Sequence, residues 1–235
     1  MSVKAPLQIL SSLIEGLPSK QRKQLLKICE PVDLIFGSIL CEADQLISHV
    51  YFPLSGFISL VTTLDGHQPL EMGLIGNEGM LGATLALGVN QAPMRAVVQG
   101  SGTALRISSA LFKQQMLDSP ALLHALKRYL YVLMAQLSQS AACTHFHEIE
   151  PRLARWLLMT HDRAHADHFH LTHEYLADML GVRRSGVSIA AGALQQRKLI
   201  SYSRGEIKVL DRVGLESAAC SCYAAVLDDY AAIFF

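Results

Sequence analysis

The sequence lacks any long apolar run, and this absence excludes a membrane-spanning helix. Hydrophobic residues make up 51% of the 235 positions, yet no apolar stretch reaches the ~18 residues that a span requires. Residues 1–18 mix charged, polar and apolar side chains, without the sustained apolar core of a secretory signal. We therefore expect a cytoplasmic protein without a membrane partner.

Cysteine is scarce and scattered, which argues against a disulfide-stabilised secreted domain. An odd number of widely spaced cysteines favours reduced thiols in a cytoplasm. The five cysteines are Cys29, Cys41, Cys143, Cys220 and Cys222.

Signatures of catalysis are also missing. The sequence has no nucleophile elbow, no phosphate-binding glycine loop and no histidine pair around a glutamate on a helix. We therefore predict that the protein is not an enzyme.

A dense group of histidines supports the alternative, a metal-dependent enzyme, with Cys220 and Cys222 as conceivable further ligands. The histidine spacings match no established zinc pattern, and the Cys-x-Cys pair falls on an expected helix. We therefore predict a solvated polar connector, no bound metal and no cofactor. The histidines are His145, His147, His161, His165, His168, His170 and His173.

A net charge is missing too, because 20 basic residues balance 20 acidic ones. Overall charge thus gives no indication of a nucleic-acid partner, but phosphate contacts need only local cations. Residues 183–212 hold seven basic and two acidic residues, a net charge of +5, which favours double-stranded DNA as a partner. The basic residues are Arg183, Arg184, Arg197, Lys198, Arg204, Lys208 and Arg212.

Residues 171–194 predict two short helices joined by a turn at Gly181. Thr172 is a good N-cap for the first helix, and apolar residues at helical spacing give each helix one face to bury. These apolar residues are Leu176, Met179, Leu180, Val187, Ala190, Ala191 and Leu194. The spacing alone also fits a packed helical hairpin without a ligand.

The opposite face of the second helix would be free to enter a major groove. It carries Arg184, Ser185, Ser188 and Ile189, while Arg183 stands at the cap position and would serve a phosphate. We count Thr172 at the start of the first helix with these DNA-binding residues.

Residues 199–211 form two strand-like runs around Arg204-Gly205, which predicts a β-hairpin. A hairpin directly after a helix-turn-helix is a wing, and it would bring Arg204 and Lys208 to the phosphate backbone. This favours a winged helix-turn-helix domain over residues 151–235, with a helical tail from Val213.

Residues 32–107 alternate short apolar runs with glycines, and Asp65-Gly66 is a strong hairpin signal. This pattern predicts a small β-barrel or jelly roll. Helical segments between Leu7 and Ile28, broken at Pro18 and with Ser19 as a cap, precede it. We assign residues 1–118 to this domain, for which the family resemblance described below implies a sensor function.

A long helix is expected to begin at Ser119-Pro120 and to stop at the hinge Glu150-Pro151. Its leucines recur at intervals of three and four, which is typical of a coiled-coil seam between two chains. These are Leu123, Leu126, Leu130, Leu133 and Leu137. Residues 119–150 are therefore the predicted dimerisation helix and hinge, although such a stripe also suits an ordinary core. A polar connector over His161–His170 follows.

The order of these parts resembles the Crp/Fnr family, the regulators related to the cyclic-AMP receptor protein and the fumarate-nitrate regulator. The resemblance rests on HVYFPLSGFISLV (residues 49–61), PRLARWLL (151–158) and residues 171–200. It implies an α+β fold with a cyclic-nucleotide-binding-like barrel, a dimerisation helix and a C-terminal winged helix-turn-helix. It also implies a homodimeric bacterial transcription regulator that reads an inverted repeat and contacts RNA polymerase. A scaffold protein with a vestigial DNA-binding domain is the alternative.

The effector pocket departs from the family pattern. Gly82-Ala83 stands where nucleotide-binding members have a Gly-Glu pair, and Arg95 lies only near the place of their phosphate-binding arginine. A missing acceptor and a missing cation each weaken binding, so we predict no tight cyclic-AMP binding and leave the effector unidentified. The clustered N-terminal cysteines of the iron–sulfur branch are absent. A haem ligand at His49 or His67 remains open, although both fit surface loops.

The recognition helix departs as well. Members that read a GTGA half-site carry an Arg-Glu pair and then a second arginine. Arg184 matches the first arginine, whereas Ser185 replaces the glutamate and Ile189 the second arginine. Arginine pairs with guanine, but isoleucine touches only a thymine methyl, so we expect a different operator.

Overall fold

The computed structural model describes residues 11–164 and 166–234, and the chain divides into two compact units. The N-terminal unit comprises Met1–Ile58 and Ile75–Leu130, and the C-terminal unit comprises Ser59–Leu74 and Tyr131–Phe235. None of the described helices is both long and apolar enough to cross a membrane.

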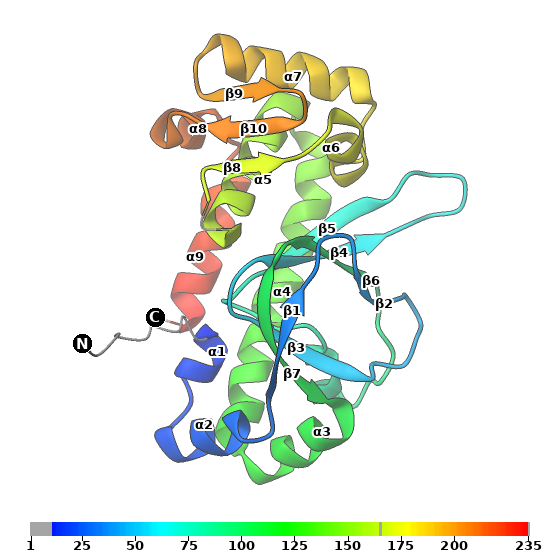
Figure 1. Cartoon of the computed structure of the whole chain (residues 1–235), viewed down its shortest axis with the longest axis vertical. Helices are drawn as coiled ribbons and strands as arrows, with labels where there is room; N and C mark the ends of the chain where they lie inside the picture. Colours follow the sequence, from blue (N-terminus) through cyan, green and yellow to red (C-terminus); the bar gives the residue numbers. More distant parts are fainter. Residues whose placement is uncertain (1–10, 165, 235) are drawn as a thin grey trace, which may run out of the picture. The chain divides into compact units, whose positions relative to one another are not determined.

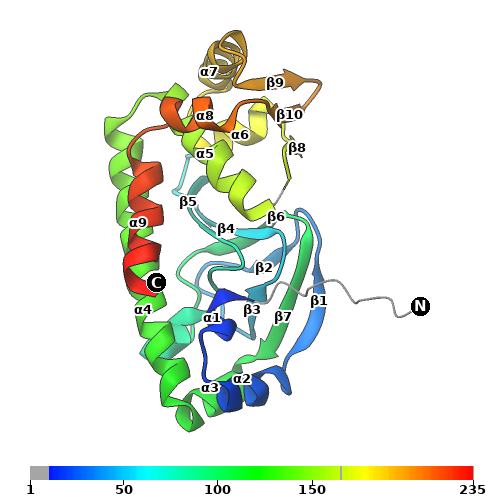
Figure 2. The same ribbon diagram turned by 90° about the vertical axis from the view of Figure 1, so that its left-hand side faces the viewer.

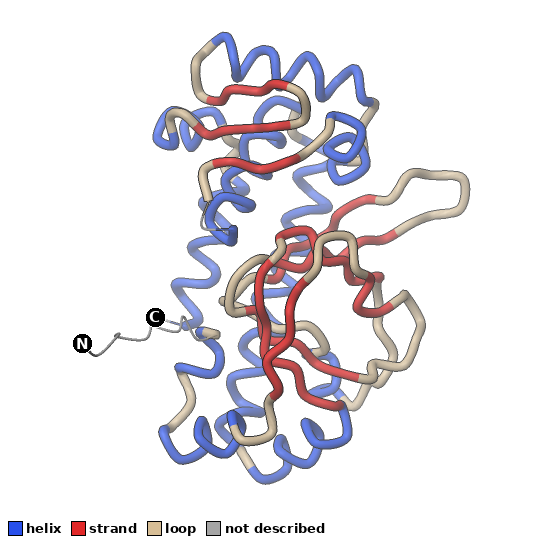
Figure 3. Tube along the Cα trace, viewed as in Figure 1, coloured by secondary structure: helices blue, strands red, loops and turns tan. Residues whose placement is uncertain are grey.

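Two β-sheets dominate the first part of the chain (Figures 1 and 3). One has the order β1-β7-β3, and its strands are β1 (Glu30–Leu34), β3 (His49–Pro53) and β7 (Gly102–Ser108). The other has the order β2-β6-β4-β5, with β2 (Ile39–Cys41), β4 (Phe57–Thr62), β5 (Leu70–Ile75) and β6 (Arg95–Gly100). The expected β-rich jelly roll is confirmed, as two separate sheets rather than a closed barrel.

Glycine is needed where these strands turn closely past each other. Gly56 has φ +71°, and a Cβ on it would lie 2.3 Å from the carbonyl oxygen of Gly100. No side chain fits at Gly56 without a shift of the backbone, so this position requires glycine. The hairpin expected at Asp65-Gly66 is also present, because Gly66 (φ +76°) lies between β4 and β5.

Four short helical elements accompany the strands: α1 (Ser12–Glu15), α2 (Ser19–Leu26), η1 (Ala83–Leu87) and α3 (Ser109–Asp118). The break expected at Pro18 is confirmed. The expected cap at Ser19 is wrong, because Pro18 itself takes the extended cap position and Ser19 is the first helical residue. The part of this prediction from Leu7 to Leu10 lies outside the described residues.

Helix α4 (Pro120–Phe146) begins as predicted, since the Ser119 hydroxyl accepts a hydrogen bond from the Leu122 amide at 3.3 Å. Its predicted end at Glu150-Pro151 is wrong. The helical conformation is interrupted at His147-Glu148. Helix α5 (Ile149–Ala164) then begins, with Pro151 in its first turn. Proline is tolerated there because the missing N–H has no acceptor within the helix.

In the described part of the C-terminal unit, α5 is followed by a three-stranded sheet and four helices (Figure 2). The sheet has the order β8-β10-β9, and the elements are β8 (His168–His170), α6 (His173–Leu180), α7 (Arg184–Gln196), β9 (Ile200–Ser203), β10 (Glu206–Val209), α8 (Arg212–Ala218) and α9 (Cys222–Phe234). The helical tail is thus confirmed over the described residues.

The predicted polar connector over His161–His170 is wrong at both ends. Helix α5 continues through His161, and residues 168–170 form β8, an additional strand of the wing. Phe169 explains the strand, because it is buried opposite Ile207 of β10 while its neighbours are exposed. His165 lies outside the described residues.

The β4–β5 hairpin contributes a carboxylate to the interior of the C-terminal unit. Glu71 on β5 accepts hydrogen bonds from the Ser59 hydroxyl at 2.5 Å and from the Trp156 indole of α5 at 2.8 Å. Loss of hydration raises the pKa of Glu71 to about 7, although both hydrogen bonds and the charges of Arg155 and Arg163 lower it. Burial therefore outweighs every favourable partner of this carboxylate.

Candidate nucleic-acid interface

The two helices α6 and α7 have the local geometry of the predicted helix-turn-helix. The Thr172 hydroxyl accepts a hydrogen bond from the Tyr175 amide at 3.1 Å and so caps α6. Gly181 ends α6 in the left-handed conformation (φ +62°), which glycine reaches without strain. Arg183 occupies the N-cap position of α7 without a side-chain cap bond. This is expected, because a guanidinium has no hydrogen-bond acceptor for a backbone amide.

The apolar faces predicted for both helices are buried, which confirms how the pair is oriented in its domain. The exposed fractions of these side chains are 7% or less. The set is Leu176, Met179, Leu180, Val187, Ala190, Ala191 and Leu194.

The opposite face of α7 is open to solvent. Arg184, Ser185 and Ser188 are exposed, and Ile189 leaves 75% of its surface uncovered. Gly192, one turn further on, is exposed and has no heavy atom within 4 Å of where a Cβ would stand. The surface of α7 is therefore open at Gly192, where another molecule could approach the helix backbone closely.

His173 adds a contact that the sequence reasoning missed. The Ser188 hydroxyl donates to the Arg184 carbonyl at 3.1 Å, so the second Ser188 bond, to Nδ1 of His173 at 2.8 Å, has the imidazole as donor. The imidazole also stacks on Tyr202 of β9, with 4.2 Å between ring centroids. Partial burial and the charge of Arg184 lower the pKa of His173, which favours the neutral ring.

The wing is the predicted hairpin with one strand more. Arg204 (φ +53°) and Gly205 (φ +84°) form the two-residue turn between β9 and β10, with both residues in the left-handed region. Arg204 and Lys208 are exposed. Lys208 lies between Ser201 of β9 and His168 of β8 in the sheet register. The wing therefore presents positive charge at its tip and on one face.

Two of the seven cations serve the domain itself. Arg197 forms an ion pair with Glu150 at 2.8 Å, and Arg212 forms ion pairs with Asp162 at 2.7 Å and Glu216 at 3.0 Å. Arg184 lies 3.8 Å from Glu174, but both side chains are exposed, and such pairs contribute little. Arg184 is therefore free to exchange Glu174 for a stronger partner.

Residues 151–218 match the family model of the Crp-like helix-turn-helix domain. The whole fold is similar to that of a protein from Eubacterium rectale described as a transcriptional regulator of the Crp/Fnr family. The two share 18% identity over 88% of this chain and 96% of that chain, with a TM-score of 0.69. This chain has the Crp/Fnr fold and a Crp-like helix-turn-helix domain.

Two further structures support the same fold. FixK2 from Bradyrhizobium japonicum is 13% identical, covers 82% of this chain and 98% of its own, and has a TM-score of 0.69. The c-di-GMP-responsive regulator CLP from Xanthomonas campestris is 15% identical, covers 82% and 99%, and has a TM-score of 0.67. No curated protein sequence matches the chain.

The residues predicted near an effector all lie among the described residues of the jelly roll. Gly82 (φ +93°) caps η1, and Ala83 is 3% exposed. The Arg95 guanidinium forms an ion pair with Glu42 at 2.6 Å. These placements show where Gly82, Ala83 and Arg95 lie, and their role towards an effector stays a prediction.

The leucines of α4 divide between the interior and the surface. Leu126 is fully buried within its own chain, together with Tyr129. The remaining seam residues are half-buried, and Met134 leaves 60% of its surface exposed. Those half-buried residues are Leu123, Leu130, Leu133 and Leu137.

The described histidines of the predicted cluster lie in different elements rather than at one point. His161 bonds Asp167 and Arg212, whereas His170 bonds Glu206. His145 and His168 are exposed. His147 alone among them lies beside thiols, 3.4 Å from Cys222, an arrangement that the sequence spacing did not indicate.

Proposed function

We propose that this chain is a sequence-specific DNA-binding transcription regulator that acts in the cytoplasm as a homodimer on an inverted-repeat operator. In this proposal, residues 1–118 sense a signal, 119–150 pair the chains, and 151–235 bind DNA and present a surface to RNA polymerase. The observation that carries the proposal is the exposed polar face of α7 next to a wing with exposed cations.

The proposed roles follow from the chemistry of each side chain. Arg184 pairs with a guanine, and Ile189 contacts a thymine methyl. Ser185 and Ser188 hydrogen-bond to base edges. Contacts to phosphates, which position the domain without reading sequence, come from Thr172, Arg183, Arg204 and Lys208.

The dimer seam is proposed for the uncovered side of α4. Leu123, Leu130 and Leu137 repeat at heptad spacing and are half-buried within one chain. Met134 lies between them at the intervening position and is exposed. Leu133 borders this seam, whereas Leu126 fills the interior beneath it.

Arg184→Ala tests the assignment of the recognition helix. Loss of a guanine contact should weaken binding to the operator by about 5- to 150-fold, the equivalent of about 1–3 kcal/mol. Binding to unrelated DNA should weaken much less, because phosphate contacts dominate it. Gel retardation at fixed salt, with fragments selected from the host genome, measures both.

Arg197→Ala is the matched control, because the Arg197 guanidinium is already paired with Glu150 at the other end of α7. It should leave the ratio of specific to non-specific binding unchanged. Equal retardation by Arg184→Ala and wild type would show that α7 does not read the operator through Arg184.

Cyclic AMP should not bind tightly. The place of the ribose-binding glutamate holds Ala83, and Arg95 is paired with Glu42, so a bound phosphate would have to displace a carboxylate. Isothermal titration calorimetry of the folded chain should show no binding in the micromolar range. A dissociation constant of micromolar or below would refute this prediction.

A further inference from the structure

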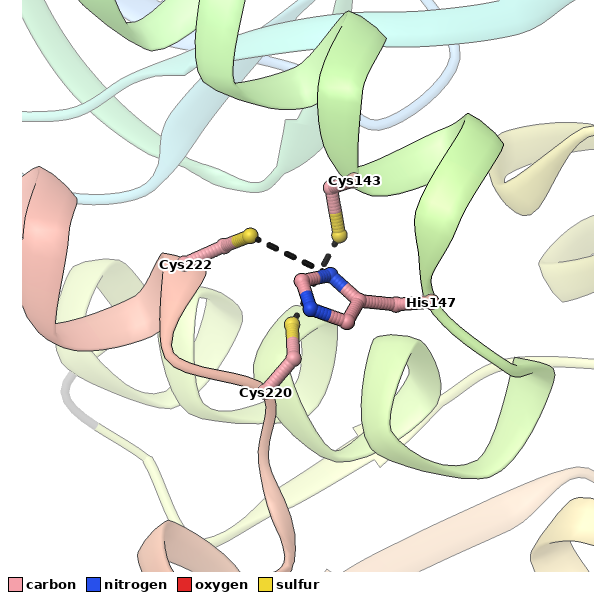
Figure 4. Close-up of side chains that lie close together, drawn as sticks. All are labelled: Cys143, His147, Cys220 and Cys222. Atoms are coloured by element: carbon pink, nitrogen blue, oxygen red, sulfur yellow. Dashed lines mark hydrogen bonds between the residues drawn. The ribbon is translucent and has the colours of Figure 1, made fainter.

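Three thiols and an imidazole meet in the C-terminal unit (Figure 4). The side-chain donor atoms of Cys143, His147, Cys220 and Cys222 all lie within 4.8 Å of one another. The Sγ atoms of Cys143 and Cys220 are 3.5 Å apart, and Cys222 Sγ is 3.4 Å from His147 Nδ1. Cys143, Cys220 and Cys222 are buried, and His147 is half-buried.

Two segments distant in sequence supply these groups. The His147 amide bonds the Cys143 carbonyl at 3.1 Å, which continues the helical geometry of α4 by one residue and puts both side chains on one face. Cys220 lies between α8 and α9, and Cys222 is the first residue of α9. The Cys220 amide bonds the Pro151 carbonyl at 3.3 Å, which holds this connection against the start of α5.

One of the two sequence-based reasons for expecting no metal is that Cys220-x-Cys222 would lie on a helix. That expectation is wrong, because Cys220 precedes α9. Residues two apart on a helix do not face each other, whereas a connection before the helix lets both sulfurs turn to one point, as Figure 4 shows.

We propose that these four residues form a structural zinc site. Zn–S bonds of ~2.3 Å and Zn–N bonds of ~2.0 Å in a tetrahedron separate neighbouring ligand atoms by about 3.5–3.8 Å. The two separations of 3.5 and 3.4 Å nearly match this. Four protein ligands leave no open position, which is typical of structural rather than catalytic zinc.

The surroundings suit the charge of such a site. Zn²⁺ with three thiolates and a neutral imidazole has a net charge of −1. Arg152 and Arg155 both interact electrostatically with the Cys143 sulfur, and Gln139 donates a hydrogen bond to Cys222 Sγ at 2.9 Å. Such outer contacts orient thiolate ligands and offset their charge.

A disulfide is the alternative interpretation of this cluster, but it would account for only two of the four residues. A Cys143–Cys220 bond would leave Cys222 and His147 without a role, although both point at the same centre. A zinc ion instead binds all four. It links the end of α4 to the start of α9, beside the interruption at His147-Glu148 that separates α4 from α5.

The test uses the full chain, purified under reducing conditions without chelator. Elemental analysis should find stoichiometric zinc, and a mercurial thiol reagent should release it. Cobalt(II) added to the metal-free chain should give the intense near-ultraviolet charge-transfer absorption of thiolate ligands. Cys143→Ser and Cys220→Ser should each lose most of the bound zinc.

Cys29→Ser and Cys41→Ser are matched controls, because these half-buried cysteines lie in the N-terminal unit. Both should keep the zinc. The proposal is overturned if the folded wild-type chain takes up neither zinc nor cobalt, or if the Cys143 and Cys220 variants retain zinc as the controls do. A Cys143–Cys220 disulfide in place of the metal would also overturn it. None of these readouts depends on DNA binding.

Discussion

Leu130→Asp is expected to convert the protein to a monomer and to lower its affinity for an inverted-repeat operator by about 10²- to 10⁴-fold. Leu130 stands on the half-buried side of α4, next to the exposed Met134. An aspartate there would put an unpaired carboxylate between two chains, which is costly to desolvate. A monomer then binds one half-site without the high effective concentration that the second half-site gives.

Sedimentation and gel retardation on one operator fragment measure the two effects together. Met134→Asp serves as a second variant, because a side chain 60% exposed is not needed for folding of its own chain. His124→Asp is the control, since His124 is exposed on a different side of the same helix. A Met134→Asp protein that stays dimeric and binds fully would remove α4 as the dimer seam.

Glu71→Gln is expected to remove a pH dependence of stability that the wild type shows near neutrality. Burial raises the pKa of Glu71 from 4.5 to about 7, so the folded chain holds the proton more tightly than the unfolded chain does. The resulting stabilisation is complete below pH 4.5 and is lost as the pH rises through about 7. The full loss corresponds to about 3 kcal/mol.

Glutamine keeps the shape of the side chain and can still accept the indole hydrogen bond of Trp156. The melting temperature of Glu71→Gln should therefore rise relative to wild type between about pH 5 and pH 7 and level off above about pH 7, because over this range the unfolded chain has released a proton that folded Glu71 still holds. Glu15→Gln, at an exposed carboxylate, is the control and should show no such trend. A constant difference between Glu71→Gln and wild type across this range would contradict the prediction.

Local signals were sufficient to predict the helix-turn-helix. Thr172, Gly181 and the two apolar faces act within a few residues, so cap, turn and buried side follow from the sequence directly. The start of α4 at Ser119-Pro120 could be predicted for the same reason.

Features that depend on contacts between residues distant in sequence could not be predicted from local patterns. Strand β8 exists because Phe169 pairs opposite Ile207, more than thirty residues later. The apolar residues of α4 fall on two overlapping faces of the helix, so the sequence did not show which face is buried. The structure buries Leu126 and leaves Met134 exposed. The thiol–imidazole cluster joins residues at the end of α4 to residues more than seventy positions later, without a spacing that a known motif would reveal.

The division of the chain into units has a consequence for its dissection. The unit boundaries fall inside β4, β5 and α4, so the chain passes from one unit to the other within regular structure rather than in loops. A fragment that began at Tyr131 would contain the Crp-like domain but would lack Glu71, the hydrogen-bond acceptor of the Trp156 indole. The C-terminal unit is therefore not one continuous stretch of sequence, since residues 59–74, which come far earlier in the chain, complete its interior.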